Sequence, residues 1–196
     1  MSTLLKDLRK RFRARRQRGR LLDEQAFYAG RFASRGLTIP GPVDIRRVLR
    51  VRFPGLAAVP KGRLRILAVY HHYNWEDESL KPSLEAFGPV TLYDWGEGFN
   101  RTSREWIPTI RDEMNRDLLK RVSAWMAESP FHVIFTYLSG EQVSAHTIEK
   151  LRVFGVPIVN LALNDKEHFV GKIRGGQAMG MRDICRYFDL CWTSTE

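Results

Sequence analysis

From residue 65 onward, short apolar runs alternate with longer stretches in which apolar residues recur every three or four positions. The apolar runs are rich in β-branched and aromatic residues and predict strands at 65–71, 89–95, 132–138, 157–163 and 190–194. The periodic stretches predict helices at 79–87, 103–128, 144–154 and 177–187. Strands that alternate with helices form parallel sheets, and strands that are apolar throughout indicate cover on both faces. The pattern therefore predicts an α/β fold, a Rossmann-like parallel sheet of about five strands with helices on both faces.

The first 62 residues follow a different pattern. Residues 3–34 carry an apolar stripe flanked by arginines and predict a helix, which Gly19 can divide into two. A segment with two glycines and two prolines follows and predicts a linker, and a short helix is predicted at 43–51. We therefore divide the chain into a basic helical N-terminal extension with its linker, 1–62, and a Rossmann-like domain, 63–196.

Positive charge is concentrated at the N-terminus. The formal net charge is +10, and residues 1–20 hold nine Lys or Arg against one acid, so this arm carries +8 and the remainder only +2. Because Leu4, Leu8 and Phe12 share one helix face with these charges beside them, the arm is expected to lie on an anionic membrane surface. The alternatives are a protein partner, nucleic acid bound through its phosphates, and a solvated tail.

The location of the protein is inferred from what the chain lacks. No apolar run approaches the roughly 20 residues that span a bilayer, and the N-terminus lacks the apolar middle of a signal peptide. The two cysteines, Cys185 and Cys191, have neither zinc-site spacing nor the number for a disulfide framework. We expect a cytoplasmic protein with reduced thiols, peripheral at the inner face of the membrane if the arm binds lipid.

Candidate chemistry lies in the loops that follow the strands, because ligands of such sheets bind beyond the carboxyl ends of the strands. The first strand ends at His71 and His72, and either imidazole can act as a general base near neutral pH. The structural alternative is a strand-end histidine bonded to the backbone. Aromatic residues here can stack on a sugar ring or pack as core or lid, and the candidate substrate-binding residues of this loop are Tyr73, Asn74 and Trp75.

The later loops add further polar groups. Asp94 ends the second strand, and Ser139 and Gly140 lie between the third strand and its helix, where a helix N-terminus binds anions or a serine simply caps the turn. After the fourth strand, the candidates for binding a polar substrate are Asn164, Asp165 and His168. Asp165 is also a candidate catalytic residue, and its alternative role is to cap the local turn.

The familiar cofactor patterns are missing. The loop after the first strand lacks the GxGxxG that lets a backbone approach a pyrophosphate, and the glycine-rich IRGGQAMG lacks the Gly-Lys-Ser/Thr of a P-loop. Asp165 and His168 are too few ligands for a metal. We therefore expect no cofactor and no metal.

The segment FTYLSGEQVSAHTIEKLRVFGVPIVNLALND, followed by a short helix and RYFDLCWTST, resembles the N-terminal half of GT-B glycosyltransferases. Within them it is most similar to the spore-maturation-protein-like group. The resemblance covers roughly residues 63–196. It depends on the dipeptides Asn164-Asp165 and Phe188-Asp189, and on Thr193 and Ser194, which follow the second dipeptide. The chain departs from the pattern at YHHYNWEDES, where many such enzymes carry a glycine-rich loop, and this shifts the expected catalytic role to His71 or His72.

The resemblance implies two Rossmann-like domains facing a cleft, with the acceptor on the first and a nucleotide sugar on the second. Thr193 and Glu196 have the spacing of a capping box that begins a helix, so we expect a further domain to follow. The expected function is the acceptor-side domain of a glycosyltransferase that transfers a sugar from a nucleotide-sugar donor to a glycan or lipid-linked acceptor, inactive without its donor half. One of His71, His72 or Asp165 would deprotonate or orient the acceptor hydroxyl. The alternative is a non-catalytic α/β binding or response domain whose basic arm binds nucleic acid or a membrane.

Overall fold

The computed structural model describes residues 3–36, 38, 40–163 and 169–193. The chain divides into two compact units, Met1–Arg47 and Val48–Glu196. In the first unit, α1 (Thr3–Ser34) is one continuous helix that passes through Gly19. Its exposed large apolar side chains are Leu8, Phe12, Leu22, Phe27, Tyr28 and Phe32. Among the described residues, no helix has both the length and the apolar composition needed to cross a membrane.

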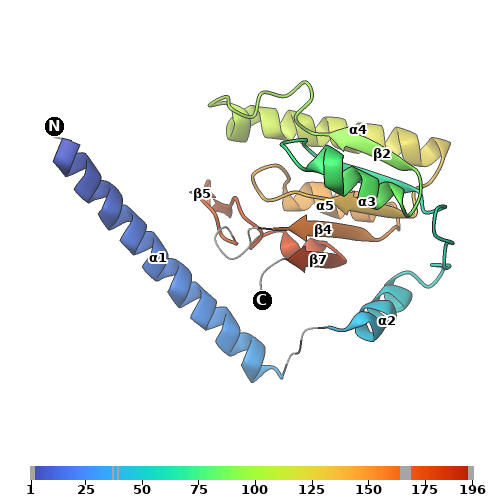
Figure 1. Ribbon diagram of the computed structural model, residues 1–196, viewed down its shortest axis with the longest axis horizontal. Helices are drawn as coiled ribbons and strands as arrows, with labels where there is room; N and C mark the ends of the chain where they lie inside the picture. Colours follow the sequence, from blue (N-terminus) through green and yellow to red (C-terminus); the bar gives the residue numbers. More distant parts are fainter. Residues whose placement is uncertain (1–2, 37, 39, 164–168, 194–196) are drawn as a thin grey trace. The chain divides into compact units, whose positions relative to one another are not determined.

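The second unit contains the predicted parallel sheet (Figure 1). Its strands are β1 (Ile66–Tyr70), β2 (Val90–Asp94), β3 (Val133–Thr136), β4 (Ile158–Ala162) and β7 (Leu190–Thr193). They lie in the order β2-β1-β3-β4-β7, and every neighbouring pair is parallel. The chain steps from β1 to β2 on one side and then returns to β3 on the other, so the strand order reverses between β1 and β3.

Helices cover both faces of this sheet, as predicted (Figure 1). The helices α4 (Arg111–Glu128) and α5 (Ala145–Arg152) pack on one face, and α3 (Lys81–Glu85) packs on the other. A π-helical turn precedes α3 and another precedes α4, at Glu76–Leu80 and Trp106–Ile110. The helix α2 (Pro42–Arg52) begins in the first unit and ends in the second.

The hydrophobic core has two parts because alternate strand residues point to opposite faces. Leu67 and Val69 of β1 face α4 and α5, whereas Ile66, Ala68 and Tyr70 face α3. All five residues of β1 are buried. This burial on both faces explains why the strand reads as a continuous apolar run.

The helix predicted at 177–187 is wrong. Residues 173–178 instead form a hairpin of β5 (Ile173–Arg174) and β6 (Gln177–Ala178), and only Cys185–Tyr187 forms a 3-10 turn. The hairpin forms because Gly175 and Gly176 adopt φ values of 55° and 79°, which fold the chain back on itself at little steric cost for glycine.

Asp189, which contributes to the resemblance, lies at the amino end of β7. Its carboxylate accepts a hydrogen bond from the backbone N–H of Ile158 at 2.8 Å and forms an ion pair with Arg52. The side chain of Asp189 is 1% exposed. Asp189 therefore has a structural role at the edge of the sheet opposite the carboxyl ends of the strands.

Candidate functional site

A cavity of about 390 Å³ lies at the carboxyl edge of the sheet, where the strand order reverses. The residues that follow β3 and those at the carboxyl end of β4 form much of its wall, and Tyr73, Trp95 and the segment around the hairpin complete it. Its polar lining residues include Ser139, Glu141, Gln142 and Lys172. A concave, mostly apolar site with a few polar groups is the usual form of a small-molecule site.

The loop after β1 is stabilised by the carboxylate of Glu76, which accepts hydrogen bonds from the backbone of the same loop. The backbone N–H groups of Tyr73 and Asn74 both donate to Glu76 Oε2 at 2.9 Å, and Glu76 is 1% exposed. Burial alone would raise the pKa of Glu76, but these backbone hydrogen bonds outweigh it and hold the pKa below its usual value. Because these two donors already bind an internal anion, they are not available to hold a ligand phosphate.

His71 is held against Asp94 in the same loop. Its Nδ1 lies 2.7 Å from Asp94 Oδ1, which also accepts the backbone N–H of Gly96 at 2.7 Å. Because that carboxylate oxygen is an acceptor, we assign the proton to His71 Nδ1, which leaves the Nε2 lone pair available. The imidazole contacts the rings of Tyr73 and Trp95, with centroids 4.8 and 5.0 Å away. It therefore contacts two residues of the cavity wall without lining the cavity itself, and a quarter of its side chain is exposed.

The other candidates of this loop have local roles. His72 Nδ1 lies 3.3 Å from Asp77 on the exposed surface. The side chain of Asn74 accepts a hydrogen bond from the backbone of Trp75 at 2.8 Å. The ring of Trp75 packs near Tyr137, with centroids 6.1 Å apart. Of the two strand-end histidines, the structure thus pairs the imidazole of His71 with the strand-end carboxylate of Asp94, whereas His72 reaches that carboxylate through its backbone N–H.

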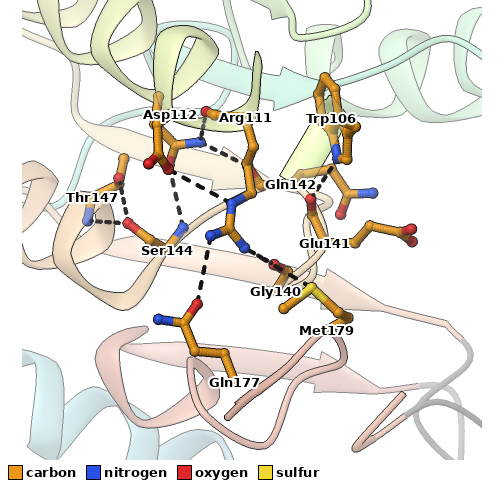
Figure 2. A network of polar contacts seen from close by, with 11 residues as sticks. Trp106, Arg111, Asp112, Gly140, Glu141, Gln142, Ser144, Thr147, Gln177 and Met179 are labelled. Atoms are coloured by element: carbon orange, nitrogen blue, oxygen red, sulfur yellow. Dashed lines mark hydrogen bonds and ion pairs between the residues drawn. The ribbon is translucent and has the colours of Figure 1, made fainter. Parts of the chain in front are cut away.

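The loop after β3 is held by side chains of the segment that leads into and forms α4 (Figure 2). Three consecutive carbonyl oxygens accept hydrogen bonds from it: Gly140 from Arg111 Nη1 at 3.1 Å, Glu141 from Trp106 Nε1 at 2.9 Å, and Gln142 from Asn115 Nδ2 at 2.8 Å. All three donor residues are buried. The loop is therefore fixed on its far side, and its own side chains remain at the cavity.

Arg111 also connects this loop to the hairpin. Its guanidinium donates to Gln177 Oε1 at 3.5 Å and lies 4.0 Å from Met179 Sδ (Figure 2). Its Nε lies 3.8 Å from a carboxylate oxygen of Asp112. Arg111 is 7% exposed, so its charge is stabilised mainly by neutral acceptors.

Ser139 and Gly140, the two predicted site residues of the loop after β3, differ in their roles. Ser139 lines the cavity, and its N–H and hydroxyl both donate to Gln142 Oε1, at 2.9 and 2.8 Å. Gly140 packs so closely on the hairpin segment that an added Cβ would lie 2.4 Å from the carbonyl oxygen of Ala178. Its N–H donates to Gly180 O at 2.9 Å, so it is not available to an anion. The N-cap of α5 is Ser144, whose Oγ accepts from Thr147 N at 3.2 Å.

The parallel sheet thus brings His71, Tyr73, Asp94 and Ser139 to one edge. Asn164, Asp165 and His168 lie outside the described residues. The sequence interpretation did not single out several residues of the cavity wall, namely Trp95, Tyr137, Glu141, Gln142, Lys172 and Met179. The sequence did contain a signal for the hairpin beside that wall. Gly175 and Gly176 lie between two short segments that can form strands, a pattern that is typical of a β-hairpin.

The titratable tyrosines near the cavity are shifted towards the neutral form. Burial raises the pKa of Tyr137, and Glu76 adds to this effect. Burial likewise raises the pKa of Tyr73, and the charge of Arg101 partly offsets it. In the part of the chain that the structure describes, no group of three or more His, Cys, Asp or Glu side chains is arranged to bind a metal ion.

Comparison of the chain with protein-family models, with curated proteins and with solved structures gave no significant match. The functional argument therefore depends on the geometry of the carboxyl edge and on the chemistry of the residues found there.

Proposed function

We propose that this chain is the acceptor-side domain of a glycosyltransferase. The observation that carries the proposal is the cavity at the reversal of strand order, with the His71–Asp94 pair in contact with its lining residues Tyr73 and Trp95. Open α/β sheets bind ligands at this point. Aromatic rings beside amide, carboxylate and ammonium groups suit a polyhydroxylated acceptor.

The closed loop after β1 supports the acceptor role over the donor role. A nucleotide sugar needs its diphosphate neutralised, commonly by backbone N–H groups at such a loop. Here the N–H groups of Tyr73 and Asn74 are taken by Glu76. The donor phosphates would therefore be bound by a second domain, as in the GT-B arrangement.

The proposed chemistry uses His71 as a general base. Nε2 takes the proton of an acceptor hydroxyl while the hydroxyl oxygen attacks the anomeric carbon of the donor sugar, and the bond to the nucleoside diphosphate breaks. Asp94 orients the imidazole and stabilises the imidazolium that forms. For this step the acceptor hydroxyl must reach the exposed part of the His71 ring.

The test follows the imidazole signals of His71 by NMR while oligosaccharides and alkyl glycosides are added, as mimics of glycan and lipid-linked acceptors. We expect a saturable shift at His71 and none at His146, an exposed histidine of α5. Assignment uses His71→Asn and His146→Asn. If no acceptor mimic moves the His71 signals, or if nucleotide sugars move them at lower concentration, the acceptor role is wrong.

A second variant tests whether the position of His71 matters. In Gly96→Ala, the new Cβ would lie 2.2 Å from His71 Nδ1 and would push the imidazole off Asp94. We expect the acceptor-induced shift at His71 to be lost or to need at least tenfold more ligand, about 1.4 kcal/mol. Gly55→Ala is the matched control, since an added Cβ there meets nothing within 4 Å.

The exposed surface of α1 favours a second candidate function, a binding domain that acts through its arm. Phe12 is 76% exposed beside a concentration of arginines, which suits an anionic membrane surface. Replacing Arg13, Arg15 and Arg16 by Gln should abolish binding to phosphatidylserine vesicles and leave the His71 shifts unchanged. Salt-sensitive binding of RNA or DNA, with no response of His71 to acceptor mimics, would favour the binding domain over the transferase.

A further inference from the structure

A second cavity, of about 150 Å³, adjoins the first. Its lining residues are Trp95, Arg101, Thr102, Trp106, Glu141 and Gln142. Trp95, Glu141 and Gln142 also line the larger cavity, so the two cavities share walls. We refer to the second one as the small cavity.

The contact of Arg101 with Tyr73 joins one lining residue of each cavity. Arg101 Nη1 donates to the Tyr73 hydroxyl at 2.7 Å, and its guanidinium carbon lies 4.4 Å from the centre of the tyrosine ring. Tyr73 lines the larger cavity and Arg101 the small one. Because the two cavities share Trp95, Glu141 and Gln142, one ligand with two joined parts can extend from one cavity into the other.

Two indole rings form the apolar part of the small cavity. Trp95 and Trp106 are 2% and 5% exposed, and their ring centroids are 5.8 Å apart. Trp106 Nε1 donates to the Glu141 carbonyl, whereas Trp95 Nε1 has no hydrogen-bond partner in the described part of the chain. A buried N–H without an acceptor costs roughly 1–3 kcal/mol.

The polar groups of the small cavity carry both signs of charge. Arg101 is a cation and Glu141 an anion, and Thr102 contributes a hydroxyl. Gln142 uses its Oε1 to accept from Ser139, which leaves its NH₂ group able to donate to a ligand. A carboxylate or phosphate ligand would meet Glu141. A neutral ring with hydroxyl groups can use every one of these groups and can stack its C–H face on an indole.

We propose that the small cavity binds one neutral pyranose ring, the part of the acceptor nearest the Trp95 and Trp106 indoles. That this ring belongs to an acceptor rests on the proposed function; that the small cavity binds a pyranose does not. The proposal assigns Glu141 and Trp95 as recognition residues that determine which sugar is bound.

The test observes the indole N–H signals of ¹⁵N-labelled protein while methyl glycosides of glucose, galactose, mannose and N-acetylglucosamine are added. The titration covers the millimolar range, in which a ligand of this size is expected to bind. At least one glycoside should shift the Trp95 and Trp106 signals saturably. Trp75 and Trp125 serve as internal controls because neither lines the small cavity.

Glu141→Gln separates a neutral ligand from an anionic one. The variant keeps the shape of the side chain but loses the charged acceptor, so glycoside affinity should fall about tenfold. Inorganic phosphate is the anionic probe, and it should not compete with the glycoside in either protein. Glu149→Gln, an exposed position on α5, should leave glycoside affinity unchanged.

Three results would overturn the proposal: no glycoside shifts the two indole signals, Glu141→Gln leaves the affinity unchanged, or uridine or adenosine shifts the indoles where no glycoside does. The responses of the indoles and of His71 also separate the two hypotheses. Indole shifts from methyl glycosides without any acceptor response at His71 would support the pyranose site and reject the transferase. The reverse result would reject the pyranose site alone.

Discussion

The ends of β1 and β3 are neighbours at the point where the strand order reverses, yet their loops are stabilised in opposite ways. After β1, backbone N–H donors bind a carboxylate of the same loop, Glu76. After β3, backbone carbonyl acceptors bind donors from a distant segment, among them Arg111 and Asn115. The backbone N–H groups of Tyr73 and Asn74 in the first loop are therefore held by a local contact, and the carbonyl groups of the second loop by tertiary contacts.

This difference determines what each loop can offer a ligand. The first loop has no free N–H pair for phosphate but presents the Tyr73 ring and the His71–Asp94 pair. The second loop is fixed from behind, which leaves Glu141 and Gln142 at both cavities.

Glu76→Ala should break the first loop and have the largest effect on stability. It leaves the N–H groups of Tyr73 and Asn74 without their acceptor, and we expect a loss of roughly 2–4 kcal/mol in the free energy of unfolding. Urea denaturation at pH 7 measures it. Glu78→Ala, an exposed neighbour in the same π-helical turn, should change stability by less than about 0.5 kcal/mol. Equal losses in both variants would show that Glu76 is not the centre of this loop.

Arg111→Met should break the second loop with a smaller effect. The Gly140 carbonyl loses its donor, at a cost of about 1–3 kcal/mol, but the removal of a poorly paired buried charge offsets part of that cost. Hydrogen exchange should also become faster at Gly140, whose N–H is bonded to Gly180. Arg116→Met, exposed on the same helix, is the matched control. Unchanged exchange at Gly140 would mean that Arg111 does not join the loop to the hairpin.

The same difference explains how much the sequence could predict. The five strands were recognisable because each contains a largely apolar run. A strand that is buried on both faces, such as β1, must be apolar at nearly every position. The rim location of His71, Asp94 and Ser139 followed from parallel topology alone. Glu76 lies within three residues of the N–H groups that it binds, a range at which local sequence patterns are informative.

The second loop could not be predicted in this way. Its contacts join residues 29 positions apart for Arg111 and Gly140, and 35 for Trp106 and Glu141, and no local pattern encodes such pairings. The hairpin was missed because the residues after Gly176 have helical periodicity. This helical preference is overridden because Gly175 and Gly176 form a turn at positive φ and because Ile173 pairs with Ala178.

Glu76→Gln should reveal the charge in the first loop through pH dependence. The folded-state pKa of Glu76 is lowered because backbone hydrogen bonds outweigh the effect of burial. Its stabilisation is therefore complete above the ordinary glutamate pKa of about 4.3 and is lost as the pH falls through the lower folded value. The variant should be less stable than the wild type by roughly 1 kcal/mol at pH 7, and the gap should close below about pH 4. A gap that stays constant between pH 7 and pH 3 would contradict this assignment.

Tyr70→Phe should give the smallest effect and the opposite sign. Tyr70 ends β1, and its buried hydroxyl has no hydrogen-bond partner among the described residues, whereas the Thr136 hydroxyl at the end of β3 donates to Asn160 Oδ1 at 2.7 Å. Removal of the tyrosine hydroxyl should therefore stabilise the protein by up to about 1 kcal/mol, and Thr136→Val should destabilise it.

Burial, with a smaller contribution from Asp77, raises the pKa of Tyr70 to about 12. Since the unfolded side chain ionises near pH 10, the stability linked to Tyr70 is lost as the pH rises from about 10 to 12, and the advantage of Tyr70→Phe should grow over that range in urea denaturation. An advantage that does not grow above pH 10 would show that the Tyr70 hydroxyl is hydrated in solution.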